Sequence, residues 1–160
     1  MAVSIAIETP LQDDVRSLVS DLNDHLSPLS PLEFQFKMTV EQMADEDTTV
    51  FVARDETGKA IGCGALKEHD DGIGEVKRMF TRPTVRGQRI GSALLDAITA
   101  LANEKGMNRL VLETGTTPGF EPAWRLYERS GFTRCGVLLD YPDSEYSAFY
   151  EKRLALAVAQ

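Results

Sequence analysis

The sequence has few of the residues that mark metal-binding, secreted or membrane-spanning proteins. Only two of its 160 residues are cysteine and two are histidine. Cys63 and Cys135 lie far apart and outside any Cys-x-x-Cys spacing, so neither a zinc site nor a disulfide framework is expected. No window approaches the roughly 18 apolar residues that span a bilayer, and the N-terminus lacks a signal-peptide pattern. We therefore expect a cytoplasmic protein that binds no metal and is neither exported nor membrane-embedded.

Basic residues are also in the minority. The chain carries 17 Lys and Arg against 25 Asp and Glu, a formal net charge of -8. That sign repels the phosphates of nucleic acids and of anionic lipids, so neither is an expected partner unless a local basic cluster intervenes. A hydrophobic fraction of 42% and a length of 160 residues instead fit one globular domain, residues 1–160, with a substantial core.

The first third of the chain predicts one strand and two helices. Apolar and polar residues alternate over 3–8, as in a half-buried strand. The TPLQ motif at 9–12 has the form of a capping box with Pro10 at the first helical position, and apolar residues at helical spacing follow it to Leu26. A second capping box, TVEQ at 39–42, predicts a short helix.

Beyond residue 48 the apolar pattern changes back and forth between strands and helices. Two strands, 50–54 and 60–67, flank a turn in which Gly58 suits the left-handed position. This order of elements indicates a mixed α/β fold with one β-α-β crossover, in which a helix joins two neighbouring strands. The elements after the hairpin are a strand at 73–81, a helix at 88–105, a strand at 109–114, a helix at 122–130 and a strand at 146–154.

The segment VRGQRIGS at 85–92 has the features of an anion-binding site. It joins a strand to a helix, and the first N–H groups of a helix have no intrahelical partner while the helix dipole places partial positive charge beside them. Small residues let a phosphate approach the backbone, and Arg86 and Arg89 add positive charge to an otherwise acidic chain. The segment lacks the lysine of a Walker loop and the three glycines of a dinucleotide-binding loop.

The same segment resembles the acetyl-coenzyme A signature of the GNAT superfamily of N-acetyltransferases, which reads Arg or Gln, two residues, Gly, one residue, and Gly or Ala. Residues 86–91 fit this signature except that Arg89 replaces its first glycine. The MFT motif at 79–81, the paired leucines at 94–95 and the AWRLYERSGF motif at 123–132 also match. The resemblance implies a GNAT-like fold: a largely antiparallel mixed sheet with a central β-α-β crossover and helices on both faces.

The resemblance also implies where acetyl-CoA binds. In the family, the strand before the signature pairs with the pantetheine arm, and the amides that open the next helix hold the pyrophosphate. Many members place an Asn where this chain has Phe120, so that contact is lost or replaced here. The implied cofactor-binding residues are Met79, Phe80, Thr81, Arg86, Gly87, Gln88, Arg89, Ile90, Gly91 and Ser92.

Two residues are predicted to carry the chemistry. Tyr127 matches the tyrosine that, in many members, protonates the departing thiolate of coenzyme A; the alternative is an ordinary core aromatic. Glu75 lies four residues before Met79, the offset of the glutamate in histone-modifying members, and is predicted to share a face of its strand with Met79. Glu75 is the first choice for the base, with simple pairing to Lys77 or Arg78 as the alternative.

Glu113, at the end of the next strand, is the second candidate for the base. By the resemblance, the acceptor pocket is built from residues 25–36 and 140–146, a lining that is acidic and aromatic and suits a small cationic amine. Solvated loops of this composition explain it nearly as well. His25 and His69 are expected at the surface. The predicted substrate-binding residues are Glu33, Phe34, Glu113, Tyr141 and Tyr146.

The sequence therefore predicts an enzyme that moves the acetyl group of acetyl-CoA to a primary amine of a small molecule or peptide by direct attack in a ternary complex. A non-catalytic acyl-CoA-binding or sensing module and an acetyltransferase for protein lysines or N-termini stay open as alternatives. An enzyme acylated on Cys63 is a further option, although no activating His is evident beside it. A homodimer is one open choice of assembly.

Overall fold

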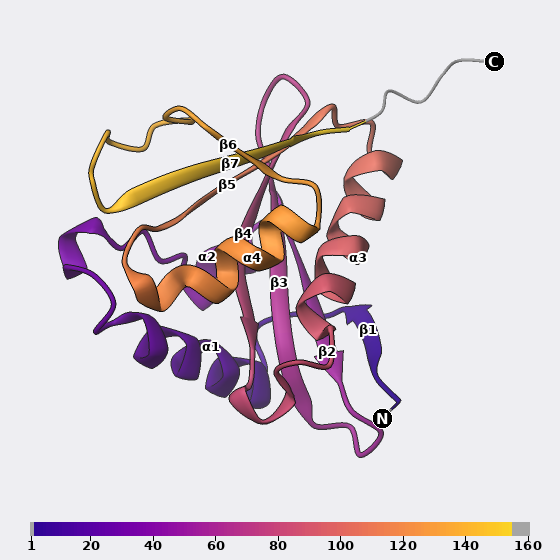
Figure 1. The fold of residues 1–160 in the computed structure, drawn as a ribbon. Coiled ribbons are helices and arrows are strands. Elements are labelled where there is room, and N and C mark those ends of the chain that lie inside the picture. The colour runs from indigo at the N-terminus through magenta and orange to yellow at the C-terminus, as the bar shows by residue number, and fades with distance from the viewer. Residues whose placement is uncertain (1, 155–160) are drawn as a thin grey trace.

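One mixed sheet of seven strands organises residues 2–154, the part of the chain that the computed structural model describes (Figure 1). The strands are β1 (Ser4–Ile7), β2 (Thr48–Arg54), β3 (Ala60–Glu68), β4 (Ile73–Thr81), β5 (Arg109–Gly115), β6 (Thr133–Cys135) and β7 (Ser147–Arg153). They lie side by side in the order β1-β2-β3-β4-β5-β7-β6, and each neighbouring pair is antiparallel except β4 and β5. The predicted largely antiparallel sheet with one crossover is confirmed.

Helices cover both faces of the sheet, as predicted. α1 (Asp13–Leu26) and α2 (Val40–Met43) pack on one face, called here the α1 face, and α3 (Ile90–Glu104) and α4 (Glu121–Arg129) pack on the other, the α3 face. Single turns of 3₁₀ helix are η1 (Leu32–Phe34), η2 (Pro83–Val85) and η3 (Pro118–Phe120). None of the helices in residues 2–154 is long and apolar enough to cross a membrane.

The first helix begins later than the TPLQ motif predicts. α1 starts at Asp13, and the preceding Gln12 makes no side-chain capping bond. Gln12 Nε2 instead donates to the Thr9 carbonyl at 2.8 Å. Local bonds of this kind compete with helical ones, so the capping box predicted at 9–12 is wrong. The second capping box forms as predicted, with Thr39 and Gln42 satisfying each other's backbone amides.

A bulge in β4 changes which side chains share a face. Arg78 has a φ of 57°, and the register with β3 slips by one residue there. Lys77 lies opposite Ala65, which packs with residues of α1 and so lies on the α1 face. Glu75, two residues earlier, shares that face. Met79 packs against the α3-face cluster. The expectation that Glu75 and Met79 share a face is therefore wrong, because the extra residue inverts the alternation.

β4 and β5 pair at one end only and then separate. Their register ends where Glu75 stands opposite Val111. β4 continues to Thr81 and β5 to Gly115, and the described strands show no further pairing between the two. The opening between them, called here the β4–β5 gap, lets side chains from both faces of the sheet meet.

Two turns form at the glycines where the sequence predicts them. Gly58 has a φ of 88° in the turn between β2 and β3, and Gly106 has a φ of 76° just after α3. The sequence does not predict β6, since three residues are too few to show a period. Its pairing with β7 depends instead on how the chain returns after α4.

Candidate active site

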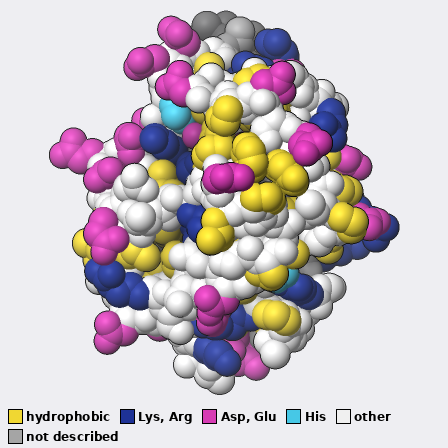
Figure 2. All heavy atoms as spheres, turned by 90° about the vertical axis from the view of Figure 1, so that its left-hand side faces the viewer, with side chains coloured by type: hydrophobic (Ala, Val, Ile, Leu, Met, Phe, Trp, Pro, Cys, Tyr) yellow, Lys and Arg dark blue, Asp and Glu magenta, His cyan; other side chains and the backbone are white. Residues whose placement is uncertain are grey.

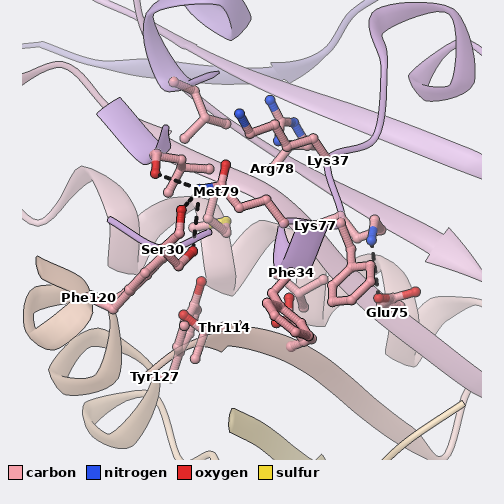
Figure 3. Close-up of a pocket in the computed structure, with 18 residues that line it drawn as sticks. Ser30, Phe34, Lys37, Glu75, Lys77, Arg78, Met79, Thr114, Phe120 and Tyr127 are labelled. Carbon is pink, nitrogen blue, oxygen red and sulfur yellow. Dashed lines mark hydrogen bonds and ion pairs between the residues drawn. The ribbon is translucent and has the colours of Figure 1, made fainter. Parts of the chain in front are cut away.

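A pocket of about 140 Å³ occupies the β4–β5 gap (Figure 3). Its walls include residues 75–79 of β4, residues 113–115 of β5, residues 34–37 after α1, and Tyr127 of α4. Figure 3 shows Tyr127 across the pocket from Arg78. The pocket therefore gathers polar side chains from segments that are distant in the sequence.

Glu75 lies in the pocket wall within a network of hydrogen bonds. Its side chain is 4% exposed. The Tyr141 hydroxyl donates to Glu75 Oε2 at 2.5 Å, Lys77 Nζ lies 3.4 Å from the same oxygen, and His69 Nε2 lies 2.9 Å from Oε1. Lys77 also donates to the Tyr141 hydroxyl at 2.8 Å. These partners hold the carboxylate in one orientation, and the pairing with Lys77 that the sequence offered as an alternative is present.

Glu113 faces the same pocket with fewer partners. It stands opposite Phe149 of β7 and so projects toward the side of the sheet that Tyr141 covers. Ser147 Oγ donates to its Oε2 at 2.9 Å. Burial raises the pKa of Glu113 to about 7, against smaller lowering effects of Ser147 and Lys77. A carboxyl group with this pKa exchanges a proton readily near neutral pH.

Tyr127 reaches the pocket from the α3 face. It is buried, with the rings of Phe132 and Tyr150 centred 6.0 and 6.1 Å away, so the core packing that the sequence offered as the alternative is present. It also lines the pocket. Burial, and then the nearby Glu113 and Tyr150, raise the pKa of Tyr127 above its ordinary value, which keeps the hydroxyl protonated.

The start of α3 has the geometry of an anion site. Residues 86–89 are exposed, and Gly87 has a φ of 87°. Arg89 caps the helix with a φ of 61°, the left-handed region, at the position where the GNAT signature has glycine. Within the described chain the amides of residues 90–92 make no backbone hydrogen bonds, as expected for a first helical turn.

The edge of β4 along the gap offers further backbone groups. The Arg82 amide donates to the Ile61 carbonyl of β3 at 2.9 Å. Because successive residues of a strand direct their backbone groups to alternate sides, those of Thr81 and Met79 point away from β3 and toward the gap. These are the residues predicted to pair with the pantetheine arm.

The predicted acceptor-binding residues are only partly together. Phe34 and Glu113 line the pocket. Tyr141 and Tyr146 lie outside the lining. Tyr146 stacks on Phe34 with ring centroids 4.9 Å apart, and Tyr141 belongs to the network around Glu75. Glu33 is exposed and also lies outside the lining.

Sequence reasoning missed the basic side of the pocket. Lys37, Lys77 and Arg78 line it together with Glu75 and Glu113. The lining is therefore mixed in charge. The loop composition suggests an acidic lining, and that expectation is wrong. The feature of the sequence that could have indicated these basic residues is the adjacent pair Lys77 and Arg78 within an otherwise largely apolar strand. On the face drawn in Figure 2, too, basic and acidic side chains are interspersed.

His69 differs from expectation, and the surroundings of Cys63 disfavour the option of an enzyme acylated there. The His69 side chain is only 23% exposed and contacts Glu75, so it is not the solvated surface residue predicted; His25 is exposed as expected. Cys63 is fully buried, and its Sγ donates to the Arg78 carbonyl at 3.3 Å. Burial raises the pKa of the Cys63 thiol to about 12, which suppresses the thiolate that an acylated enzyme would need.

Comparison with known proteins agrees with this geometry. Residues 15–132 match the acetyltransferase (GNAT) family. The chain belongs to this family. It is 40% identical over 153 residues to an IAA acetyltransferase from Azospirillum brasilense, and the alignment covers 95% of this chain and 98% of that relative. The GNAT assignment makes the protein an acetyl-CoA-dependent N-acyltransferase.

Solved GNAT structures share the fold. A protein from Klebsiella pneumoniae described as an acyl-CoA N-acyltransferase has a TM-score of 0.81 and 28% identity, covering 96% of this chain and 98% of that one. The PaiA N-acetyltransferase of Thermoplasma acidophilum, solved in complex with coenzyme A, has a TM-score of 0.75 and 16% identity, covering 96% and 100%. The mixed sheet with its β4–β5 gap is thus a GNAT fold.

Proposed function

We propose that this protein transfers the acetyl group of acetyl-CoA to a primary amine of a small molecule by direct attack in a ternary complex. The observation that carries the proposal is that Glu113 and Tyr127, two groups suited to moving protons, meet in one pocket from opposite faces of the sheet. The size of the pocket, about 140 Å³, favours a small acceptor, and Phe34 of its wall is held by stacking on Tyr146.

The residues present fit coenzyme A at two places. The unpaired amides of residues 90–92, with the helix dipole behind them, suit a pyrophosphate, and Arg86 and Arg89 are exposed beside them. The backbone groups of Met79 and Thr81 that point toward the gap suit the amides of a pantetheine arm. An extended arm along β4 would lead from the start of α3 toward the pocket.

Acetyl-CoA supplies a thioester, so that an N–C bond forms at its carbonyl carbon as the C–S bond breaks and coenzyme A leaves as a thiolate. Glu113 accepts a proton from the acceptor ammonium, which frees the nitrogen lone pair for attack. Tyr127 donates its hydroxyl proton to the thiolate sulfur. The second nitrogen proton restores the Tyr127 hydroxyl, and Glu113 releases its own proton to solvent, so one proton is set free per turnover.

We assign the base to Glu113 ahead of Glu75, which reverses the order that the sequence alone favoured. Glu75 already has three partners, in His69, Lys77 and Tyr141. Glu113 has one hydrogen-bond partner, Ser147, and a pKa that burial raises to about 7. In this proposal Glu75 orients the neighbouring groups.

Two measurements test the proposed function. Acetyl-CoA should stabilise the protein against heat, by about 2.7 kcal/mol at one hundred times its Kd if it binds only the folded state. An assay of thiol release over a panel of small amines should then find turnover. Binding without turnover on amines or on protein lysines would favour the sensing module, and no thermal shift at millimolar acetyl-CoA would remove the proposal.

A further inference from the structure

Arg78 is a buried arginine without an acidic partner. The residue is 8% exposed, its Nη2 donates to the neutral Asn23 Oδ1, and its Nε is buried with no hydrogen-bond partner. None of the ion pairs found in residues 2–154 includes it. A buried guanidinium in this state is unfavourable, because the hydration that it loses is not replaced.

Other partly buried arginines of the described chain do have carboxylate partners. Arg82 is the closest comparison, because it follows Arg78 in the same stretch of chain and also reaches α1. α1 presents a carboxylate, Asp21, to Arg82 but only the amide of Asn23 to Arg78. Such pairs, with their N–O distances, are Arg82 and Asp21 at 2.6 Å, Arg54 and Glu8 at 2.8 Å, and Arg109 and Glu151 at 2.8 Å.

The β4 bulge brings this side chain to the pocket. Strict alternation would direct Arg78, like Val76, toward the α3 face. With the bulge, Arg78 instead reaches Asn23 of α1 and lines the pocket. The bulge requires a left-handed φ of 57° at a residue that carries a side chain, an unfavourable backbone conformation of the kind that concentrates at functional sites.

A second unpartnered atom lies on the same pocket. Gln35 Nε2 donates to the Ser30 carbonyl at 2.7 Å, which fixes the orientation of the amide, and Gln35 Oε1 is buried without a partner. Within residues 2–154, Gln35 Oε1 and Arg78 Nε are the buried side-chain atoms found without partners, and both residues line this pocket. Since buried polar groups are normally paired, the two together indicate a ligand that offers an acceptor to Arg78 and a donor to Gln35.

We propose that the acceptor is an aminocarboxylate, whose carboxylate binds Arg78 while its amino group lies toward Gln35 and Glu113. The inference rests on the proposed function and names the class of its acceptor. The planar fork of a guanidinium matches the two oxygens of a carboxylate. Of the two lysines in the lining, Lys77 is paired with Glu75, and Lys37 adds positive charge on the same side.

The first test compares acceptors that differ only in this group. A panel of L-amino acids, each beside its own carboxamide, is assayed for thiol release with saturating acetyl-CoA. For the best acceptor, kcat/KM should exceed that of its carboxamide by about 10²-fold, the usual scale for a charged partner lost from a buried pair. Carboxamides that react as well as the amino acids would overturn the inference while the proposed function stands. Turnover of neither group would count against both.

The second test removes the guanidinium. In Arg78→Met, kcat/KM for the amino acid should fall by about 10²-fold while that for the carboxamide changes little, and Arg78→Lys should fall between. Acetyl-CoA affinity, measured by calorimetry, should be unchanged. A loss of acetyl-CoA affinity in both variants would assign Arg78 to the coenzyme and overturn the inference.

Thermal stability supplies a readout that does not depend on activity. Without ligand, Arg78→Met should melt at a higher temperature than the wild type, because an unpaired buried charge has been replaced by an apolar chain of similar length. The matched control Arg82→Met breaks the pair with Asp21 and should melt lower without altering the preference for a carboxylate. A lower melting temperature in Arg78→Met, with the carboxylate preference retained, would show that Arg78 only tethers α1.

Discussion

The Tyr141 hydroxyl donates a 2.5 Å hydrogen bond to Glu75, a residue 66 positions earlier in the chain. Lys77 donates to the same hydroxyl at 2.8 Å, so the segment before β7 is tied to β4 by two bonds at one atom. Burial, followed by the charge of Glu75, raises the pKa of Tyr141, which keeps the phenol protonated and donating.

Tyr141→Phe should therefore destabilise the fold by about 2 kcal/mol, because Glu75 and Lys77 lose a shared partner while staying buried. Urea denaturation measures the change in the free energy of unfolding. Tyr146→Phe is the matched control, since Tyr146 contributes its ring to Phe34 and should change stability by less than about 0.5 kcal/mol. Equal losses in the two variants would mean that the Tyr141 hydroxyl adds nothing.

The raised pKa of Glu113 should make the stability of the protein depend on pH. Burial raises the pKa of Glu113 from its ordinary value of 4.5 to about 7 in the folded protein, so the folded state holds the proton more tightly than the unfolded state does. The wild type should then lose stability relative to Glu113→Gln as pH rises from about 4.5 to 7. The variant should be more stable at pH 8 by on the order of 3 kcal/mol and no more stable at pH 4.

Urea unfolding at a series of pH values measures this difference, with Glu33→Gln as a control at an exposed glutamate. A gap between Glu113→Gln and the wild type that is constant with pH would contradict the raised pKa.

The roles of Glu113 and Glu75 should be distinguishable from the kinetics of their glutamine variants. Glu113→Gln should lower kcat/KM by roughly 10²- to 10⁴-fold and remove the rise of the pH profile near 7, because no carboxylate is left to take the ammonium proton. The loss should shrink at high pH, where more of the acceptor arrives deprotonated. Glu75→Gln should lower kcat/KM while the rise near pH 7 remains. The opposite pattern would return the base to Glu75.

Tyr127→Phe should keep acetyl-CoA binding and lose turnover, by roughly 10²- to 10⁴-fold, since the ring still packs against Phe132 and Tyr150 but no acid is left for the thiolate. Calorimetry and thiol release measure the two effects separately. Tyr150→Phe removes a hydroxyl that bonds to Glu128 outside the pocket and should retain most of the activity. Full activity in Tyr127→Phe would mean that the thiolate leaves without its help.

Arg89→Gly should separate backbone strain from charge at the start of α3. Glycine relieves the left-handed φ of 61° but costs chain entropy, so stability should stay equal or rise by up to about 1 kcal/mol. Coenzyme A should bind about two- to fivefold more weakly at low salt, and less so at high salt. Arg86→Gly removes the same charge at a φ of -63°, so it should weaken binding alike and also lower stability. Equal changes in stability in Arg89→Gly and Arg86→Gly would contradict backbone strain at Arg89.

The fold follows from the sequence because its signals are local and repeated. The buried residues Val15, Leu18, Val19 and Leu22 of α1 recur at helical spacing, and Gly58 takes the positive φ that its turn requires. Thr39 and Gln42 interact across one helical turn, so their capping box is visible in the sequence. The TPLQ motif fails because Gln12 bonds to the Thr9 carbonyl instead.

The site is harder to predict because it depends on distant contacts and on one extra residue. The anion-binding segment at 85–92 could be proposed from the sequence because its residues are contiguous. The network of Glu75 with Tyr141 joins segments that no periodicity relates. The bulge at Arg78 inverts the alternation of β4, so a period of two puts Met79 on the wrong face and gives no reason to place Arg78 in the pocket.

The separation of β4 from β5 leaves the protein with two strand edges in its interior. An unpaired edge on the outside of a sheet invites another chain to add to it, which is a common route to aggregation. Here the edge carrying Met79 and Thr81 faces the β4–β5 gap, whose other walls come from β5, α4 and the loop after α1. A ligand that docks along this edge would instead complete the hydrogen bonding of the sheet, and the Met79 and Thr81 amides would then exchange with solvent more slowly.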